Sequence, residues 1–575
     1  MSVAIGSTQA AFCATFIDEM ERGGVRHAVV CPGSRSTPLV LAAIRSSLTI
    51  HVRLDERSAG FFAIGLAKMT GAPVLVMVTS GTAVAELAAS VIEADLDRVP
   101  LIVATADRPP ELVGTGAPQT IAQAGIFGAA VRLAVDPGPV HAIAPSAWRA
   151  LASRLVIEAR GGTSRLAGPV HLNVPLVDPL VAEPTSIPLG RTDGDPWYRL
   201  DRPALGAGNP LAPWIGRRGL VVAGEGSGSG DEILVAATRL GWPVLADPRC
   251  EARRSDPFVV TTADALLRDP RIAQAFAPEV ILIAGGLPAS KVVNQWIATL
   301  ASDGVDVVRI GLGGLQRHPS MATATFLDIE PEELWRSVSS DTTACDEGWR
   351  AQWAGAEVAA RGVIGSMLAE DDLSEPQVAT TVSNHAALAG ATLVVSSSMP
   401  IRDLEWYAAP EAEAPRVLAN RGANGIDGVV STAIGAASAE AGPVIALVGD
   451  LAFLHDVSAL GDDLAPGLTL VVVVNDNHGG GIFSFLPQRD AMELQEFERL
   501  FATPKATDPV KVAAGFGYRS QRVATEPQLR AAITAGLEHG GLSVVVCSVL
   551  SRDANVELHD RLTSAVAVAA TATLA

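Results

Sequence analysis

The chain of 575 residues contains little cysteine, little lysine and no long hydrophobic run. Its five cysteines are scattered and odd in number, with no Cys-x-x-Cys pair, which argues against a disulfide framework or a structural zinc site. The longest strongly apolar run, Leu468–Val474, is far shorter than a membrane span. Asp18 and Glu19 interrupt the apolar N-terminal stretch, unlike in a signal peptide. We therefore expect a cytoplasmic protein that does not associate with a membrane.

Positive charge is also scarce, because 43 Lys and Arg residues face 62 Asp and Glu residues, for a net charge of −19. Such a field repels polyanions, so a nucleic-acid partner is not expected. The negative net charge does not exclude a local pocket lined by basic residues. Arginine supplies nearly all the positive charge. The only lysines are Lys68, Lys291, Lys505 and Lys511.

What the chain does contain is apolar sequence in short, regularly spaced runs. Hydrophobic residues make up 48% of the chain, enough for several cores. In the first 180 residues, apolar runs typical of buried strands alternate with helical patterns, which predicts parallel sheets joined by crossover helices. The predicted strands are His27–Cys31, Pro73–Thr79, Leu101–Ala106 and Val170–Val174, and the predicted helices are Thr8–Arg22, Glu56–Thr70 and Thr82–Asp97.

The alternation of apolar strands and helical patterns is repeated twice more along the chain. A Pro- and Gly-rich stretch from Asp178 to Pro213 reads as a linker, and Asp341–Gly362 as a helical connection. We therefore predict three doubly wound α/β domains with parallel sheets, over residues 1–182, 183–365 and 366–575. The later predicted strands are Leu220–Ala223, Pro243–Ala246, Val280–Ala284, Val305–Ile310, Thr392–Ser396, Val444–Val448, Leu468–Asn475 and Ser543–Val549.

Two apolar strands of the third domain end in polar residues that suit a metal. Gly449-Asp450 follows one, and Asn477, 27 positions after Asp450, follows the next. Both lie at the carboxyl edge of a parallel sheet, where ligands bind in open α/β folds. A carboxylate, an amide and a backbone carbonyl in the glycine turn are oxygen ligands for Mg²⁺ rather than zinc. The alternative is that each piece is an ordinary strand-to-helix turn.

This pair resembles the diphosphate-metal motif of thiamine-diphosphate-dependent enzymes, although Leu451 replaces the family's second glycine. The resemblance implies a pyrimidine-binding, a central and a diphosphate-binding domain, with Asp450, Asn477 and the Gly479 carbonyl holding Mg²⁺ or Mn²⁺. It also implies that the family's carboxylate on the aminopyrimidine ring is Glu56, whose proton relay generates the reactive ylid. In isolation Glu56 would be a helix-start carboxylate. Thr79–Ala83, with Gly81, matches the turn near the pyrimidine.

Further motifs are similar, in order and spacing, to one branch of that family, the 2-succinyl-5-enolpyruvyl-6-hydroxy-3-cyclohexene-1-carboxylate synthases of menaquinone biosynthesis. The branch decarboxylates 2-oxoglutarate and adds the succinyl carbanion to isochorismate, so it is a transferase. The motifs are Cys31–Pro38, Ala106–Leu112, Gly116–Gln119, Ser398–Arg402 and Asn420–Gly428.

Both substrates are dicarboxylates, so their site needs fixed cations, and arginine binds carboxylates with two hydrogen bonds. The arginines in these motifs are Arg35, Arg108, Arg402 and Arg421. Taken singly, each is explained equally well by a structural ion pair or a solvent-exposed position. Ile426 is expected to wedge the cofactor into its bent form. The expected substrate-binding residues are Ser34, Arg35, Arg108, Gln119, Lys291, Ser398, Arg402, Arg421, Ile482 and Phe483. The expected cofactor-binding residues are Glu56, Gly81, Ser398, Met399, Ile426, Gly449, Asp450, Leu451, Asn477 and Ile482.

The resemblance further implies a homodimer or homotetramer with active sites at the subunit interface. Two alternatives remain open. One is another thiamine-dependent enzyme, either a 2-oxoacid decarboxylase or an acetolactate-type synthase, whose substrates carry fewer carboxylates. The other is a non-catalytic binding protein on the same fold, against which the presence of Glu56 argues, since pure binding needs no proton relay.

Overall fold

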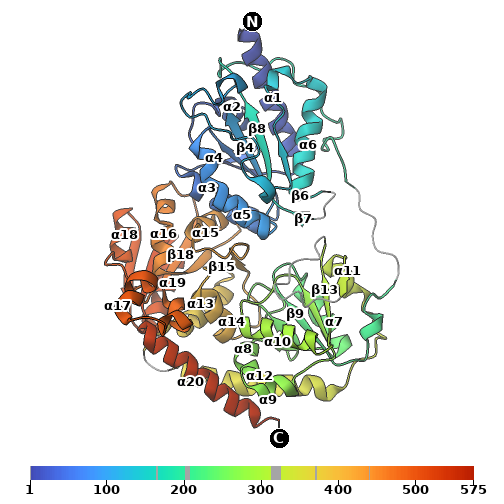
Figure 1. Cartoon of the computed structure of the whole chain (residues 1–575), viewed down its shortest axis with the longest axis vertical. Coiled ribbons are helices and arrows are strands. Elements are labelled where there is room, and N and C mark those ends of the chain that lie inside the picture. Colours follow the sequence, from blue (N-terminus) through green and yellow to red (C-terminus); the bar gives the residue numbers. More distant parts are fainter. Residues whose placement is uncertain are drawn as a thin grey trace. The chain divides into compact units, whose positions relative to one another are not determined.

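The computed structural model describes residues 2–162, 166–200, 208–312, 325–369, 372–439 and 441–574. Within these ranges the chain forms three six-stranded parallel sheets flanked by helices, which confirms the predicted doubly wound α/β class (Figure 1). A two-stranded antiparallel ribbon, β6 (Arg160–Gly161) with β7 (Leu166–Ala167), is added to the first part of the chain. None of the described helices combines the length and apolarity needed to cross a bilayer.

The N-terminal sheet has the strand order β2-β1-β3-β4-β8-β5. Its central strands β3 and β4 are buried along their whole length, as expected for strands covered by helices on both faces. Its strands are β1 (His27–Val30), β2 (Thr49–Val52), β3 (Val74–Val78), β4 (Leu101–Asp107), β5 (Leu133–Val135) and β8 (Val170–Pro175). Its helices are α1 (Ser2–Arg22), α2 (Thr37–Ile44), α3 (Glu56–Thr70), α4 (Thr82–Glu86), α5 (Ala88–Leu96) and α6 (Trp148–Ala159).

The central sheet has the order β11-β10-β9-β12-β13-β14, in which the direction of winding reverses beside β9. Its strands are β9 (Gly219–Ala223), β10 (Val244–Ala246), β11 (Val259–Val260), β12 (Val280–Ala284), β13 (Asp306–Ile310) and β14 (Thr325–Leu327). Its helices are α7 (Gly230–Leu240), α8 (Ala263–Leu267), α9 (Pro270–Ala275), α10 (Lys291–Ser302), α11 (Pro331–Ser337) and α12 (Glu347–Met367).

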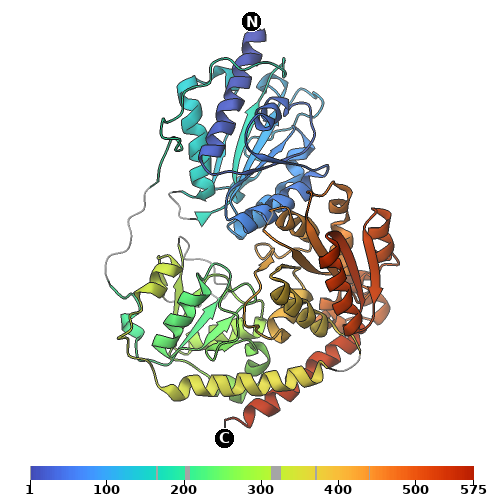
Figure 2. The same ribbon diagram turned by 180° about the vertical axis from the view of Figure 1, so that it is seen from behind.

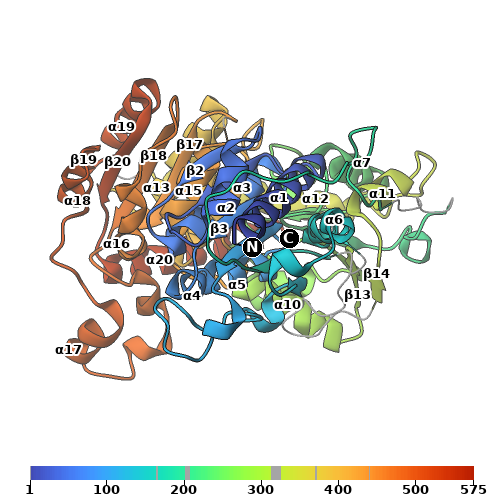
Figure 3. The same ribbon diagram turned by 90° about the horizontal axis from the view of Figure 1, so that it is seen from above.

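The C-terminal sheet has the order β16-β15-β17-β18-β20-β19. Seen from above, β18, β20 and β19 lie side by side, with α19 packed on β18 (Figure 3). Its strands are β15 (Thr392–Val395), β16 (Val417–Ala419), β17 (Val444–Gly449), β18 (Thr469–Asp476), β19 (Arg519–Val523) and β20 (Gly541–Ser548). Its helices are α13 (Glu375–Ala389), α14 (Met399–Tyr407), α15 (Val429–Ala437), α16 (Asp450–His455), α17 (Leu494–Phe497), α18 (Pro509–Gly515), α19 (Glu526–His539) and α20 (Arg552–Thr571).

All twelve predicted strands are present, with ends shifted by no more than two residues. The helix predicted over Thr82–Asp97 is wrong as a single element, because Leu87 separates α4 from α5. The described part of the Asp178–Pro213 linker contains no strand or long helix, and its residues 201–207 lie outside the described residues. The helical connection is confirmed as α12, which begins later than predicted.

The chain divides into two compact units. Unit 1 comprises residues 1–202, 420–441 and 455–468, and unit 2 comprises residues 203–419, 442–454 and 469–575. The central and C-terminal sheets therefore belong to one unit. Within it, the long helices α12 and α20 pack together, as the view from behind shows (Figure 2). The predicted domain boundaries at residues 182 and 365 stay predictions.

In unit 1, helices α3 and α15 pack closely through glycines that each contributes. A Cβ atom on Gly65 would overlap the carbonyl oxygen of Thr432, and one on Gly435 would overlap the carbonyl oxygen of Phe62. Because glycine has no side chain, the backbones of the two helices come into direct contact at Gly65 and Gly435. This contact joins residues 420–441, which carry α15, to the rest of unit 1.

Candidate active site

Glu56 is the first residue of α3, directly after the extended chain that follows β2. The preceding Asp55 caps the helix, with its carboxylate accepting from the backbone N–H groups of Arg57 and Ser58. Glu56 is half-buried, and this burial, with the nearby charges of Asp55 and Glu86, raises the pKa of its carboxyl. The Asp55 cap satisfies two N–H groups of the helix start, and the raised pKa means that the Glu56 carboxyl holds its proton more firmly than usual.

The Gly81 turn after β3 is tied to the neighbouring strands by a buried glutamine. Gly81 has φ 93°, a conformation that suits glycine, and its N–H donates to Gln123 Oε1 at 3.3 Å. The other end of Gln123 donates to the Ala106 carbonyl at 3.0 Å and to Asn173 Oδ1 at 2.8 Å. The backbone of Gln119, itself at φ 53°, packs against Gly81. The predicted cofactor turn and the predicted Gln119 are thus brought together.

Two of the predicted substrate arginines, Arg35 and Arg108, lie near each other in unit 1. Burial and the charge of Arg108 lower the pKa of the Arg35 guanidinium. Arg35 donates to the Leu176 carbonyl at 3.1 Å and approaches Asp178 at 3.6 Å. The Nε atoms of both arginines are buried, and neither has a hydrogen-bond partner among the described residues. Two neighbouring guanidinium groups whose buried Nε atoms lack acceptors in the described part of the chain are suited to binding an anion.

The loop of residues 420–428, with Arg421 and Ile426, belongs to unit 1. Its backbone N–H groups at Gly422 and Ala423 donate to the two carboxylate oxygens of Glu93, at 2.7 and 2.6 Å. Ile426 is half-buried in this loop. Glu93 therefore sets the position of the loop against α5. Ser34 is exposed in the loop after β1, where its carbonyl accepts from Thr37.

In unit 2, Asp450 follows β17 and faces the glycine turn that follows β18. Its Oδ2 accepts from the N–H of Gly479 at 2.8 Å, and its Oδ1 accepts from the N–H of Leu451 at 2.7 Å. Burial raises the pKa of Asp450 to about 6. Gly479 has φ 131°, and a Cβ there would overlap the carbonyl oxygen of Ala502. The structure thus brings together Asp450 and Gly479, as the motif predicts.

Asn477 joins them at the end of β18. Its Nδ2 donates to Glu375 Oε1 at 2.8 Å, while its Oδ1 is buried and has no hydrogen-bond partner among the described residues. Across those residues no three His, Cys, Asp or Glu side chains gather as a metal-holding group. One carboxylate, one unpartnered amide oxygen and a backbone carbonyl fit Mg²⁺ or Mn²⁺, which also accept ligand oxygens such as those of a diphosphate.

Ser398 and Arg402 belong to the turn and first helical residues after β15. Ser398 has φ 75° and ψ −136°, a conformation that serine adopts rarely and that strained functional turns use. Arg402 donates to the Ser398 carbonyl, and its burial lowers the pKa of its guanidinium. Met399, the first residue of α14, is buried at 3% exposure. These three predicted residues are therefore neighbours on one helix start.

Lys291 lies at the start of α10, and its loop contacts the same helix α14. Glu405 of α14 accepts from the N–H groups of Ala289 and Ser290, at 2.6 and 3.0 Å. Ser290 caps α10 and also donates to Asp264 at 2.6 Å. Lys291 itself is exposed. The structure thus places the loop of Lys291 against the helix that carries Arg402.

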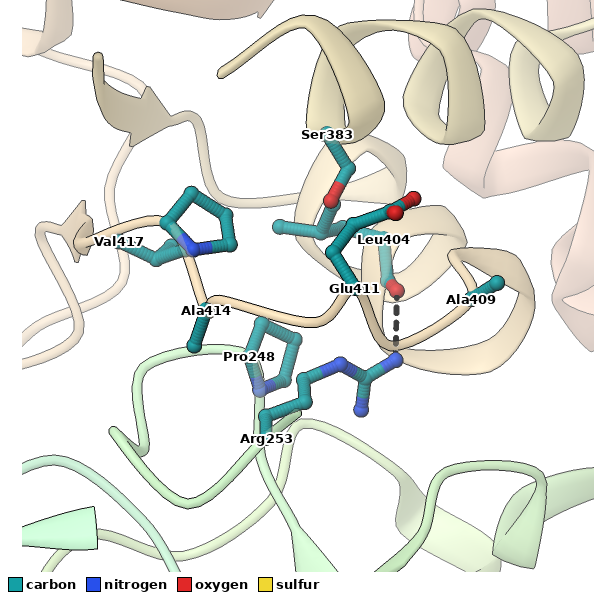
Figure 4. A pocket seen from close by; sticks show the side chains of 9 residues that line it. Pro248, Arg253, Ser383, Leu404, Ala409, Glu411, Ala414 and Val417 are labelled. Atoms are coloured by element: carbon teal, nitrogen blue, oxygen red, sulfur yellow. Dashed lines mark hydrogen bonds between the residues drawn. The ribbon is translucent and has the colours of Figure 1, made fainter. Parts of the chain in front are cut away.

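The far end of α14 is held by Arg253, which lies between β10 and β11 and lines the pocket in Figure 4. The Arg253 guanidinium donates to the carbonyls of Leu404, Glu405 and Ala408, at 3.2, 2.9 and 3.0 Å. These are carbonyls at the C-terminal end of the helix, which a cation satisfies. Since its hydrogen bonds are used in this way, Arg253 fixes α14 rather than offering a charge to a ligand.

Ile482 and Phe483 follow the glycine turn in a short 3₁₀ helix, Gly481–Phe485, and both are half-buried. Phe483 packs edge-on against Phe501, with ring centroids 5.6 Å apart. Both side chains are thus partly buried after the glycine turn, and their role as an apolar wall stays a prediction. Gly449 and Leu451 flank Asp450, where β17 ends and α16 begins.

Sequence reasoning missed two buried polar residues beside Asn477 and the glycine turn after β18. Glu375, 2% exposed, holds Asn477, and burial raises its pKa to about 8. Asn475, 1% exposed, has no hydrogen-bond partner on either side-chain atom among the described residues. Glu375 is 102 positions from Asn477, so no local spacing reveals it. Asn475 ends the predicted strand Leu468–Asn475, but its lack of a hydrogen-bond partner within the described ranges is visible only in the fold.

Comparison with known families agrees with this geometry. Residues 12–126 match the N-terminal thiamine pyrophosphate binding domain of thiamine pyrophosphate enzymes. Residues 192–393 match the middle domain of that group, and residues 406–547 match its C-terminal thiamine pyrophosphate binding domain. The fold and the two polar sheet edges thus define a thiamine-diphosphate enzyme.

The curated relatives narrow the class. The chain is 42% identical to a 2-succinyl-5-enolpyruvyl-6-hydroxy-3-cyclohexene-1-carboxylate synthase from Myxococcus xanthus, with 95% of each chain covered. It is 41% identical to the enzyme of that name from Chloroflexus aurantiacus, covering 91% of this chain and 92% of the relative. It is 36% identical to the enzyme of that name from Bacillus velezensis, covering 96% of this chain and 97% of the relative. The chain belongs to the 2-succinyl-5-enolpyruvyl-6-hydroxy-3-cyclohexene-1-carboxylate synthase family.

Proposed function

We propose that the protein decarboxylates 2-oxoglutarate and joins the resulting succinyl unit to isochorismate by 1,4-addition. The product is 2-succinyl-5-enolpyruvyl-6-hydroxy-3-cyclohexene-1-carboxylate, a menaquinone precursor. The observation that carries this proposal is the 42% identity, over 95% of both chains, to a relative named for that product. The paired Arg35 and Arg108 support the substrate class, because dicarboxylates need more fixed cations than a substrate such as pyruvate does.

Thiamine diphosphate, when bound, supplies the electron sink that lets a 2-oxo acid lose carbon dioxide. Glu56 would hold and return a proton at the aminopyrimidine ring, and the raised pKa of its carboxyl suits that role. The Gly81 turn, fixed by Gln123, would lie against the same ring. Ile426, Met399 and Ile482 would supply apolar contacts to the cofactor and keep water out.

Asp450, Asn477 and the Gly479 carbonyl would hold Mg²⁺ or Mn²⁺, and Gly449 and Leu451 would complete the diphosphate turn. Such a cation neutralises diphosphate charge that an acidic chain would otherwise repel. The unpartnered Oδ1 of Asn477 and the buried Asp450 are the observations that support this assignment.

The remaining side chains would bind the two substrates. Arginines and a lysine would pair with the carboxylates, serine and glutamine would add neutral hydrogen bonds, and Phe483 with Ile482 would give an apolar wall. The cationic and polar members are Arg35, Arg108, Lys291, Arg402, Arg421, Ser34, Gln119 and Ser398. The strained Ser398 turn and the unpartnered Nε atoms of Arg35 and Arg108 support this set.

We further propose a cytoplasmic homodimer or homotetramer with its active sites at subunit interfaces. The family resemblance supports this arrangement. Sedimentation of the full chain with thiamine diphosphate and Mg²⁺ tests it, and a monomer that turns over substrate would contradict it.

The activity is tested by incubating the full chain with thiamine diphosphate, Mg²⁺, 2-oxoglutarate and isochorismate. We expect loss of isochorismate absorbance and release of carbon dioxide in equal amounts. Pyruvate in place of 2-oxoglutarate serves as the control substrate. Release of carbon dioxide from pyruvate, with no consumption of isochorismate, would instead assign the chain to the decarboxylases.

A further inference from the structure

A buried hydrogen-bond cluster lies behind the proposed metal loop of unit 2. Its centre is Glu375, the first residue of α13, whose Oε1 accepts from Asn477 Nδ2 at 2.8 Å and from Asn555 Nδ2 at 3.2 Å. Glu375 is 2% exposed and Asn555 is 1% exposed. From this geometry we infer that Glu375 is a positioning residue, which orients the amide of Asn477 so that Oδ1 faces the metal. The inference rests on the proposed function, because it concerns the metal site proposed there.

The orientation of the amide matters because its two ends have opposite effects on a cation. The oxygen is a ligand, whereas the N–H₂ group repels positive charge. Two amide N–H donors, from Asn477 and Asn555, converge on Glu375 Oε1, so this oxygen is an acceptor whether the carboxyl is charged or protonated, and it binds the nitrogen end of Asn477. The oxygen end is then left buried and without a partner among the described residues, ready for a ligand. Glu375 therefore selects one of the two flipped states of Asn477.

Glu375 is itself held in place from two sides. It starts α13 directly after Ser374, whose side chain caps the helix by accepting from the N–H of Gln377 at 3.3 Å. Asn555, on α20, shares the same Oε1 atom. A side chain fixed by its own helix start and by a neighbouring helix loses little further freedom when it orients Asn477.

Helix α20 also holds the backbone of the loop. Arg552 donates to the carbonyl of His478, the residue next to Asn477, and forms two hydrogen bonds of 2.6 Å to the carboxylate of Glu498. Arg552 and Asn555 are three residues apart and therefore share one face of α20. That face contacts the loop backbone directly and the Asn477 side chain through Glu375.

Two substitutions separate positioning from packing. Glu375→Gln keeps an oxygen at Oε1, where two amide donors converge, so Asn477 should stay oriented. Glu375→Met has a similar shape and no such acceptor, so Asn477 Nδ2 loses its partner. Loss of an outer-layer partner commonly weakens metal binding about 10–100-fold. We expect that loss for Glu375→Met and less than about a threefold change for Glu375→Gln.

The test measures Mn²⁺ binding to the full chain with thiamine diphosphate present, by electron paramagnetic resonance of free Mn²⁺. The second readout is the rate as a function of Mg²⁺ concentration. Glu375→Met should raise the Mg²⁺ concentration needed for half-maximal rate, and saturating Mg²⁺ should restore most of kcat. A merely structural defect would lower kcat at every Mg²⁺ concentration and lower the unfolding temperature without changing Mn²⁺ affinity.

Two controls make the outcomes distinct. Glu357→Gln alters another buried carboxylate of unit 2, which contacts Thr261, Thr262 and Arg361 and not the loop, so Mn²⁺ affinity should be unchanged. Asn477→Ala removes the proposed ligand itself. If Asn477→Ala weakens Mn²⁺ binding and Glu375→Met does not, the positioning role is wrong. If neither variant weakens Mn²⁺ binding, the proposed metal site is wrong as well.

Discussion

The N-terminal and C-terminal sheets have the same strand order, 2-1-3-4-6-5 when each is numbered from its own first strand. The helix after the second strand is α3 in one and α15 in the other, and these two equivalent helices pack together through Gly65 and Gly435. The loops after the third and fourth strands differ in chemistry. In the N-terminal sheet they carry Gly81 and Arg108, and in the C-terminal sheet Asp450 and Asn477.

This difference shows that one topology supplies positions and the side chains at the carboxyl ends supply function. The central sheet differs from the other two in topology. Its strand order, 3-2-1-4-5-6, is that of a dinucleotide-binding fold. The family match names it only as the middle domain of thiamine pyrophosphate enzymes. Strand order alone therefore does not reveal which sheet edge carries chemistry.

The largest effect is expected at Glu56, the first residue of α3. The equivalent helix after the second strand of the C-terminal sheet, α15, begins with Val429 and has no carboxyl at that position. Glu56→Gln removes the proton carrier and keeps the shape, so turnover should fall about a thousandfold, within the usual range for general acid-base groups. The unfolding temperature should stay the same. Steady-state kinetics with 2-oxoglutarate and isochorismate provide the measurement. Full activity in this variant would show that the pyrimidine end is placed wrongly.

A second difference is histidine, which the N-terminal sheet carries on strands β1, β2 and β8 and the C-terminal strands do not. Burial lowers the pKa of His51 and of His171 to about 4. A folded pKa below the unfolded value of about 6.5 means that the stabilisation is present above pH 6.5 and is lost as the pH falls towards 4. His51 alone accounts for on the order of 3 kcal/mol.

His51→Phe tests this contribution, because phenylalanine can still pack on Phe62, whose ring lies 5.1 Å away. Urea unfolding at pH 7 and at pH 4.5 should show a smaller pH dependence in the variant than in the wild type. His539→Gln, at an exposed position, is the matched control. The same pH dependence in wild type and His51→Phe would contradict the assignment.

The contact between equivalent helices gives the third prediction. Gly65→Ala places a methyl group against the Thr432 carbonyl and should lower the free energy of unfolding by about 1–3 kcal/mol. Gly362→Ala, on α12, meets no atom within 4 Å and should raise it by about 0.5–1 kcal/mol. Chemical denaturation of both variants compares them. Equal effects would show that the α3–α15 contact can relax.

The smallest effect is expected at Arg108, in the anion site proposed for the N-terminal sheet. Arg108→Ala removes one of two neighbouring guanidinium groups, so the KM for a dicarboxylate substrate should rise about tenfold, the value of one charged hydrogen bond. The kcat should change less. Arg45→Ala is the control, because Arg45 forms an exposed ion pair with Glu183. An unchanged KM in Arg108→Ala would exclude this arginine from substrate binding.

The sequence predicted the buried strands well because parallel strands covered on both faces read as continuous apolar runs. It missed strands such as β14 and β19, which carry no such signal because their residues, apart from the buried Val523, are half-buried or exposed. It also missed the break at Leu87, since the apolar spacing continues across it. Local pattern therefore predicts sheet centres better than sheet edges.

The candidate site divides in a similar way. Asp450 and Asn477 were predictable because each ends a strongly apolar strand, and the structure brings Asp450 and Gly479 into hydrogen-bond contact. Glu375 and Gln123 were not, because each acts on a residue of a distant segment, and only the folded chain brings them together. The individual roles of the predicted residues stay predictions until the variants are measured.

The order in which the chain is synthesised gives the α3–α15 contact a further consequence. Gly65 leaves the ribosome more than 350 residues before Gly435, yet each of these glycines packs against the other's helix. When the first 202 residues emerge, the face of α3 that packs on α15 is still uncovered, because residues 420–441 of the same unit have not been synthesised. We expect this face of the nascent protein to need protection by a chaperone until residues 420–441 have emerged.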